Sequence, residues 1–359
     1  MDKFLAHESW VKRFLHRKEA LAIIALGLLL LFNAFFTPGF FTIDIIEGRL
    51  FGSLIDILKR ATPLMFMAIG MTFVIATGST DISVGSVAAI SAAVVAMMIG
   101  GDFDFAAGTD AVSNVPLPVA YAGALSVATL CGLRNGFLVS KLGIQALIAT
   151  LMLQVAGRGI AQLITKGTIV TVYYRPFFEF GSGFLFGLPI AIFVVSAVAL
   201  VMYLFSKKTS YGLFLEAAGS NRSSSRYSGV KVQSMVWIAF AICGFMAGVA
   251  GILISSEVRS ADPNNTGLNM ELDAILAVVL GGNSMKGGRF SLIGSLIGAL
   301  LVQSLTTTIF ARGVPAQTIL VVKAVVVILV GIIQTTDYVR MFAKFSKKRT
   351  PGIVLEAGK

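Results

Sequence analysis

Long apolar runs recur from one end of the chain to the other, and they limit the folds open to it. Of the 359 residues, 56% are hydrophobic and 13% are charged, and the mean hydropathy is +0.86. A helix of about 20 apolar residues crosses the ~30 Å hydrocarbon layer of a bilayer. Because lipid offers no partner for backbone N–H and C=O groups, helices are the expected form of these runs. The sequence therefore predicts an all-α polytopic membrane protein.

The apolar runs divide into about ten predicted transmembrane helices. They cover residues 20–38, 61–78, 83–101, 117–139, 143–164, 185–205, 232–255, 272–283, 290–311 and 317–336. The run at 272–283 is short, and the connection at 78–83 is tight. An even number of spans places both termini on one side of the membrane. No segment separates domains, so residues 1–359 are expected to form a single transmembrane domain.

Lys and Arg are unevenly distributed between the two sides that these spans define. Twenty of them lie on one side, in residues 1–19, 134–142, 206–231, 284–289 and 337–359. Seven lie on the other side: Arg49, Lys59, Arg60, Lys166, Arg175, Arg259 and Arg312. Cytoplasmic loops of membrane proteins are enriched in Lys and Arg. Both termini and the 206–231 loop are therefore predicted to be cytoplasmic, while the three outer cations within 39–60 indicate that this region is not a simple outside loop.

Several function classes are excluded by what the chain lacks. The net charge of +11 does not indicate nucleic-acid binding, because the cations gather at cytoplasmic span ends, where orientation and lipid headgroups account for them. Cys131 and Cys243 lie in separate spans and form no disulfide or metal pattern. His7 and His16 both lie in the N-terminal tail, so no catalytic triad or metal cluster is expected. No G-x-x-x-x-G-K-[ST] phosphate loop occurs, so the chain is expected to be no enzyme and to bind no cofactor itself.

The longest polar interruption, residues 206–231, is predicted to be a docking site for a separate motor. It carries five Lys or Arg and contains a short helix-forming run, Glu216-Ala217-Ala218-Gly219. A basic cytoplasmic loop with a short amphipathic helix is accessible to a soluble protein. A membrane protein without an energy source of its own would receive work at such a loop.

Two glycine-flanked polar segments, 78–85 and 281–289, interrupt the apolar pattern. In the first, Asp81 and Ser83 are suitable N-caps for the helix that follows, which is the simpler interpretation. The alternative is a helix broken near the membrane, whose freed backbone groups face a polar path. Asn135, at the inner end of the fourth span, leaves the same choice between a structural and a functional role.

Residues 261–273, on the outer side, are dense in amides and carboxylates. Glu271 and Asp273 open the eighth span, where negative charge stabilises the amino end of a helix. The functional alternative is an outer gate or vestibule for a hydroxyl-rich solute, formed with Asn264 and Asn265.

Two transport mechanisms fit a chain of this kind. An ion-coupled secondary transporter usually needs acidic residues buried in mid-span. Here Asp81, Glu271 and Asp273 all lie near span ends. This favours an importer driven by a separate ATPase and keeps the ion-coupled transporter as the alternative.

Several motifs in fixed order carry a family resemblance. They are residues 76–85 (ATGSTDISVG), 135–136 with 141–144, 218–221 with 228–230, 271–282 (ELDAILAVVLGG) and 322–326. Over nearly all its length the sequence resembles the permease subunits of ribose/xylose-type bacterial ABC sugar importers. Residues 49–58 and 262–265 look closest to the galactofuranose-type permeases. The chain departs from the family pattern at Ser79, usually Gly, and at Thr80, usually apolar.

The resemblance implies an ABC importer permease fold in the bacterial inner membrane, with import of a monosaccharide by alternating access. Galactofuranose or another furanose or pentose is the expected cargo, and an ion-coupled sugar transporter is the alternative. The implied partners are an ABC ATPase that binds ATP and Mg²⁺, a second permease subunit, a periplasmic sugar-binding protein and membrane lipids. A different chain is favoured over an identical one as the second permease.

The resemblance also implies roles for single residues. Those expected to couple to the ATPase are Glu216, Gly219, Asn221, Arg222 and Gly229. Those expected along the translocation path or its gates are Asp81, Ser83, Asn135, Asn283, Asn264, Asn265 and Glu271. No metal ligands are expected.

Overall fold

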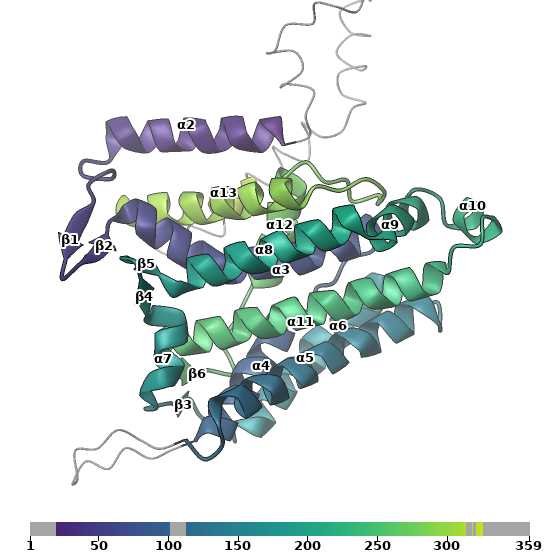
Figure 1. Cartoon of the computed structure of the whole chain (residues 1–359), viewed down its shortest axis with the longest axis horizontal. Helices are drawn as coiled ribbons and strands as arrows, with labels where there is room; N and C mark the ends of the chain where they lie inside the picture. The colour runs from purple at the N-terminus through teal and green to yellow at the C-terminus, as the bar shows by residue number, and fades with distance from the viewer. Residues whose placement is uncertain (1–18, 101–112, 314–317, 319–320, 326–359) are drawn as a thin grey trace, which may run out of the picture. The chain divides into compact units, whose positions relative to one another are not determined.

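The computed structural model describes residues 19–100, 113–313, 318 and 321–325, which are mainly helical (Figure 1). The chain divides into two compact units, residues 1–308 and 309–359. Most of the second unit lies outside the described residues, so the architecture below is that of the first. Four predicted segments lie wholly or largely outside the described residues: the tail 1–19, the outer loop 102–116, the tenth span 317–336 and the tail 337–359.

Helices dominate the element order, and the strands form three short antiparallel pairs. The helices are α2 (Ala20–Phe36), α3 (Ser53–Ala76), α4 (Val84–Ile99), α5 (Leu117–Ser140), α6 (Ala146–Ile164), α7 (Arg175–Ser182), α8 (Ile190–Lys208), α9 (Ser210–Ser220), α10 (Arg222–Tyr227), α11 (Val232–Val258), α12 (Met270–Leu280) and α13 (Leu292–Ala311). The strands are β1 (Asp44–Ile46), β2 (Arg49–Phe51), β3 (Val170–Thr171), β4 (Phe184–Leu185), β5 (Leu188–Pro189) and β6 (Ser260–Ala261). β1 pairs with β2, β3 with β6, and β4 with β5.

Nine of the ten predicted spans overlap described helices. Six of those helices are long and apolar enough to cross a bilayer: α3, α5, α6, α8, α11 and α13. α2 and α4 are apolar but shorter, and α12, with 11 residues, extends about 16 Å, roughly half the hydrocarbon thickness. The described part of the chain thus shows a helical membrane protein with six candidate spans. The count of ten and the side of each terminus stay predictions.

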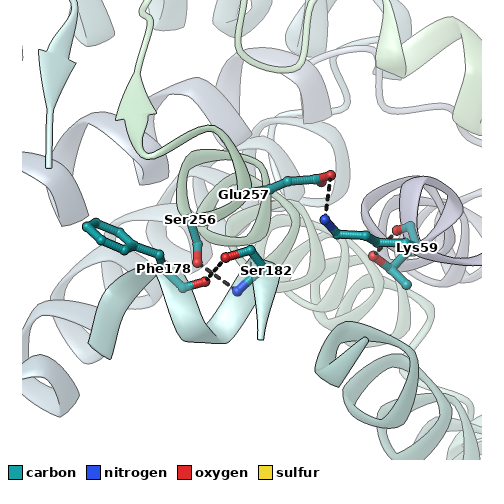
Figure 2. A network of polar contacts seen from close by, with 7 residues as sticks. Lys59, Phe178, Ser182, Ser256 and Glu257 are labelled. Carbon is teal, nitrogen blue, oxygen red and sulfur yellow. Dashed lines mark hydrogen bonds and ion pairs between the residues drawn. The ribbon is translucent and has the colours of Figure 1, made fainter. Parts of the chain in front are cut away.

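α3 begins earlier than the hydropathy pattern indicates. It starts at Ser53, eight residues before the predicted boundary, so Lys59 and Arg60 lie inside a helix. The two charges hid this start because they interrupt the apolar run. Lys59 Nζ lies 3.3 Å from Glu257 Oε1 of α11, an ion pair that joins the two helices (Figure 2). The region 39–60 is therefore a β1–β2 hairpin followed by the first turns of α3, as the outer cations indicated.

α11 is the central helix of the unit and packs on α3, α4 and α5. Glycines allow the close approach. A methyl group on Gly132 of α5 would overlap the Phe240 carbonyl oxygen of α11, and one on Gly251 would overlap the Ala88 carbonyl of α4. Small residues at such crossings let backbones pack by van der Waals contact, which replaces the hydrophobic effect inside lipid.

The two ends of the helix bundle carry different elements. The strands and α7 lie at one end, and α9 and α10 lie at the other (Figure 1). At the first end, Ser256 of α11 donates a hydrogen bond to the Phe177 carbonyl and accepts one of 2.8 Å from the Gly181 N–H, which fixes α7 to α11. The Ser182 hydroxyl closes the last turn of α7 through the Phe178 carbonyl at 2.8 Å (Figure 2). We refer below to the α7 end and the α9–α10 end.

Candidate coupling site and polar path

α9 and α10 form a helical corner between α8 and α11, where the sequence predicts the docking loop. Asn221 stands between them, and its side-chain oxygen accepts a 3.0 Å hydrogen bond from the Ser224 N–H, which caps α10. α9 buries Tyr211 and Leu215, whereas Leu213 is 68% exposed. One face of this corner is therefore packed on the bundle and the other is free.

Gly219 brings α9 against two other segments. A methyl group there would overlap the Ala76 carbonyl oxygen at the end of α3 and lie 2.6 Å from the Gly288 nitrogen. The Gly288 N–H in turn donates a 2.9 Å hydrogen bond to that same carbonyl. The end of α3, the end of α9 and the 284–288 turn therefore meet at one point, where only a residue without a side chain fits.

Arg222 fastens the corner to the turn that follows α3. Its Nη2 lies 3.0 Å from the Thr77 carbonyl oxygen and 3.3 Å from Ser79 Oγ. Hydrogen bonds from a charged guanidinium are stronger than neutral ones. Beside these contacts lies a cavity of about 370 Å³ between α10 and the α5–α6 connection. Its polar lining includes Arg222, Arg226, Gln145 and Gln233.

The other two predicted coupling residues are not among the groups that make these contacts. Glu216 is half-buried on α9, and Gly229 is exposed in the turn before α11, with φ +82° and open space around it. Gly219, Asn221 and Arg222 thus hold the corner in place. Their roles toward an ATPase stay predictions.

Asp81, Ser83 and Asn135 form one buried polar cluster, each at most 1% exposed. Asp81 Oδ1 accepts hydrogen bonds from the Ser83 N–H at 2.9 Å and from Ser83 Oγ at 2.6 Å. Asn135 Nδ2 donates to Ser83 Oγ at 2.9 Å. Ser83 occupies the N-cap position of α4, as the sequence predicts, but neither Ser83 nor Asp81 makes a side-chain cap bond, because these side chains bind one another. They join the α3–α4 turn to α5 instead.

Asn283 holds the turn between α12 and α13. Its Nδ2 donates to the Val278 carbonyl at 3.0 Å and to Ser295 Oγ at 2.9 Å, and its Oδ1 accepts from the Ser291 N–H at 2.6 Å. Ser295 Oγ also lies 2.6 Å from Thr72 Oγ1 of α3. With its amide fully engaged in the turn, Asn283 has the geometry of a structural residue, and its place on a path stays a prediction.

Asn264 and Asn265 lie in a turn built on Asp262. The Asp262 carboxylate accepts from the Asn264 N–H at 2.8 Å, the Asn265 N–H at 3.1 Å and Asn265 Nδ2 at 2.7 Å. Desolvation alone would raise the pKa of Asp262, but these hydrogen bonds outweigh it and lower that pKa. The turn is therefore organised before any partner arrives, with both asparagines exposed.

Three polar residues of α6 contact residues 263–271 and are not among the site residues predicted from the sequence: Gln154, Arg158 and Gln162. Gln162 Nε2 donates to Asn264 Oδ1 at 2.7 Å, Arg158 Nη1 to the Thr266 carbonyl at 2.6 Å, and Gln154 Nε2 to Glu271 Oε1 at 3.0 Å. Their spacing at i, i+4 and i+8 in an apolar run is the signal that could have revealed them. Glu271 is thus drawn toward α6 and is 7% exposed.

Three buried atoms of this cluster have no hydrogen-bond partner within the described residues. They are Gln154 Oε1, Arg158 Nη2 and Glu271 Oε2. A buried unsatisfied polar group costs about 1–3 kcal/mol. So many spare donors and acceptors in one place are unusual for a purely structural contact. No group of three or more His, Cys, Asp or Glu within the described ranges is placed to hold a metal.

Comparison with known proteins decides the family. A model described as the branched-chain amino acid transport system/permease component matches residues 53–331. The chain belongs to this permease family. The permease is similar to the galactofuranose transporter permease of Escherichia coli K12, with 44% identity over 89% of this chain and 90% of the relative.

Two further relatives are named as sugar permeases. The ribose import permease of Escherichia coli K12 is 35% identical over 87% of this chain and 92% of its own length. The fructose import permease of Bifidobacterium longum is 34% identical over 95% and 94%. The resemblance stated from the motifs is confirmed. The permease is a multi-pass inner-membrane subunit of the sugar ABC importer family and is not itself an enzyme.

Proposed function

We propose that the permease carries a neutral monosaccharide into the cytoplasm by alternating access, driven by a separate ATPase that docks on α9 and α10. Galactofuranose, or another furanose or pentose, is the proposed cargo, in line with the name of the relative at 44% identity. ATP and Mg²⁺ belong to the ATPase. A second permease, a different chain in preference to an identical one, completes the membrane part, and a periplasmic sugar-binding protein delivers the sugar at the α7 end.

One observation supports the coupling role: the helical corner is bound to both the α3–α4 turn and the 284–288 turn. Arg222 binds the backbone of the α3–α4 turn, and Gly219 seats α9 against the end of α3 and the 284–288 turn. A push on the free face of α9 would therefore displace both turns together. A contiguous packed network of this kind can carry energetic coupling between two sites.

Substitution of the corner tests this role in the complete transporter, reconstituted in vesicles with its ATPase and binding protein. We expect Arg222→Ala to reduce sugar uptake per ATP hydrolysed at least fivefold, since a hydrogen bond from a charged group is worth roughly 1.5–3 kcal/mol. We expect Glu216→Ala to reduce it as well, because the proposal places this carboxylate in contact with the ATPase. Ser223→Ala, on the same short helix, is the matched control and should behave as the parent protein.

The result that contradicts the proposal is uptake at the full rate by both variants while the chain remains folded in detergent. The same vesicles address the ion-coupled alternative. Sugar accumulation by the permease alone, under an ion gradient and without ATPase, would replace the proposed mechanism with secondary transport.

A further inference from the structure

The polar face of α6 stands out on a helix that is otherwise apolar. Gln154, Arg158 and Gln162 are four residues apart, so they lie one above another along about 12 Å of one helix face. All three bond to the same stretch of chain, residues 263–271. We call these three side chains with Glu271 the α6 ladder.

The ladder runs from the exposed surface into the bundle. Its outer rung, Gln162 with Asn264, is exposed. Its middle rung is Arg158, which binds the carbonyl oxygens of Pro263, Asn264 and Thr266 at 3.3, 3.4 and 2.6 Å. Its inner rung, Gln154 with Glu271, is largely buried, since Glu271 is only 7% exposed. The polar groups therefore form a continuous line of contacts from the exposed surface into the bundle.

The inner and middle rungs contain buried polar atoms that form no hydrogen bond within the described residues. Gln154 Oε1 and Glu271 Oε2 are acceptors, and Arg158 Nη2 is a donor group, and all three are buried and unbonded within the described residues. A sugar hydroxyl donates one hydrogen bond and accepts others, so a neutral polyol can satisfy both kinds of group at once. An apolar solute would satisfy none of these groups, and a cation would satisfy only the two acceptors.

The inner rung also contacts the first turn of α4, which follows the turn bound by Arg222. Gly85, in the first turn of α4, has no side chain, and a methyl group there would overlap Glu271 Oε2 and the Gly267 carbonyl oxygen. The turn immediately before α4 carries Thr77 and Ser79, the two residues bound by Arg222. A displacement of that turn would therefore move the start of α4 and change its contact with Glu271.

We propose that the α6 ladder is a sugar-binding station inside the permease, at which Gln154, Arg158 and Glu271 exchange bonds to one another and to the loop for bonds to sugar hydroxyls. The proposal rests on the proposed transport function and names the side chains that contact the cargo. Because each contact is a single hydrogen bond, the station holds a sugar weakly enough to release it.

The test uses the complete transporter in vesicles, with one binding protein throughout. The probe is whichever of D-galactose, D-ribose and D-fructose the parent protein takes up fastest, together with the monodeoxy analogues of that sugar. Uptake is measured for the parent, Gln154→Leu, Glu271→Gln and the matched control Gln303→Leu on α13. Glu271→Gln preserves side-chain size and the bond from Gln154, so it keeps the test open if Gln154→Leu fails to fold.

We expect both ladder variants to lower uptake of the full sugar roughly tenfold, as the loss of a charge-assisted hydrogen bond predicts. The decisive readout is the preference for the full sugar over a deoxy analogue. It should shrink at least threefold in a ladder variant and stay unchanged in Gln303→Leu, because the binding protein's own discrimination is the same in every arm.

An unchanged preference in every folded ladder variant, even with slower uptake, would overturn the proposal and leave the ladder as a latch between α6 and the loop. Absence of uptake of all three sugars by the parent protein in the presence of ATP would instead overturn the proposed function. The two failures are therefore distinguishable.

Discussion

At the scale of single residues, the predicted coupling positions act in two different ways. Gly219 allows close packing because it has no side chain, whereas Arg222 makes a contact with its side chain. Gly219 matters because its missing side chain admits the Ala76 carbonyl and the Gly288 nitrogen. Arg222 matters because its guanidinium reaches the next segment. The motif containing Gly219 was visible in the sequence, but its contact partners, 143 and 69 residues away, were not.

Gly219→Ala tests the close approach directly. The added methyl group must push α9 away from α3, and overpacking of this kind costs roughly 1–3 kcal/mol. We expect uptake per ATP to fall at least fivefold in the reconstituted transporter, while Ser223→Ala does not change it. Parent-like coupling in Gly219→Ala would show that the seating of α9 on α3 does not transmit work.

At the scale of elements, length and apolar content predicted where the helices lie, and tertiary contacts determined the rest. The spans at α5, α6, α8, α11 and α13 follow from runs of about 20 apolar residues. The early start of α3 was hidden because Lys59 finds its counter-ion on α11, 198 residues away. The polar face of α6 was overlooked because its partners lie more than 100 residues along the chain. Local pattern cannot report such pairings.

The α5–α11 crossing allows a prediction about stability. Gly132→Ala places a methyl group against the Phe240 carbonyl and the backbone of Gly244, so we expect the unfolding midpoint in detergent to fall by several degrees. Gly159→Ala, on α6 with nothing within 4 Å, is the control and should leave the midpoint unchanged or slightly higher. Equal unfolding midpoints for the two variants would show that the α5–α11 crossing has room for the added methyl group.

At the scale of the whole molecule, the two ends of the bundle are predicted to face different compartments. In a background with Cys131 and Cys243 replaced, we expect a thiol introduced at Ser224 to resist a membrane-impermeant reagent in intact cells. A thiol at Asn265 should react. Both should react after the membrane is opened, and rapid labelling of Ser224→Cys in intact cells would reverse the orientation and remove the ATPase from α9 and α10.

Two contacts of the corner with the segments around the end of α3 are made to main-chain oxygens: Arg222 binds that of Thr77, and Gly219 packs against that of Ala76. Every amino acid supplies the same carbonyl, so a change of side chain at Thr77 or Ala76 leaves these two contacts available. Related permeases could therefore differ in the side chains of this segment and still be driven by the same kind of ATPase.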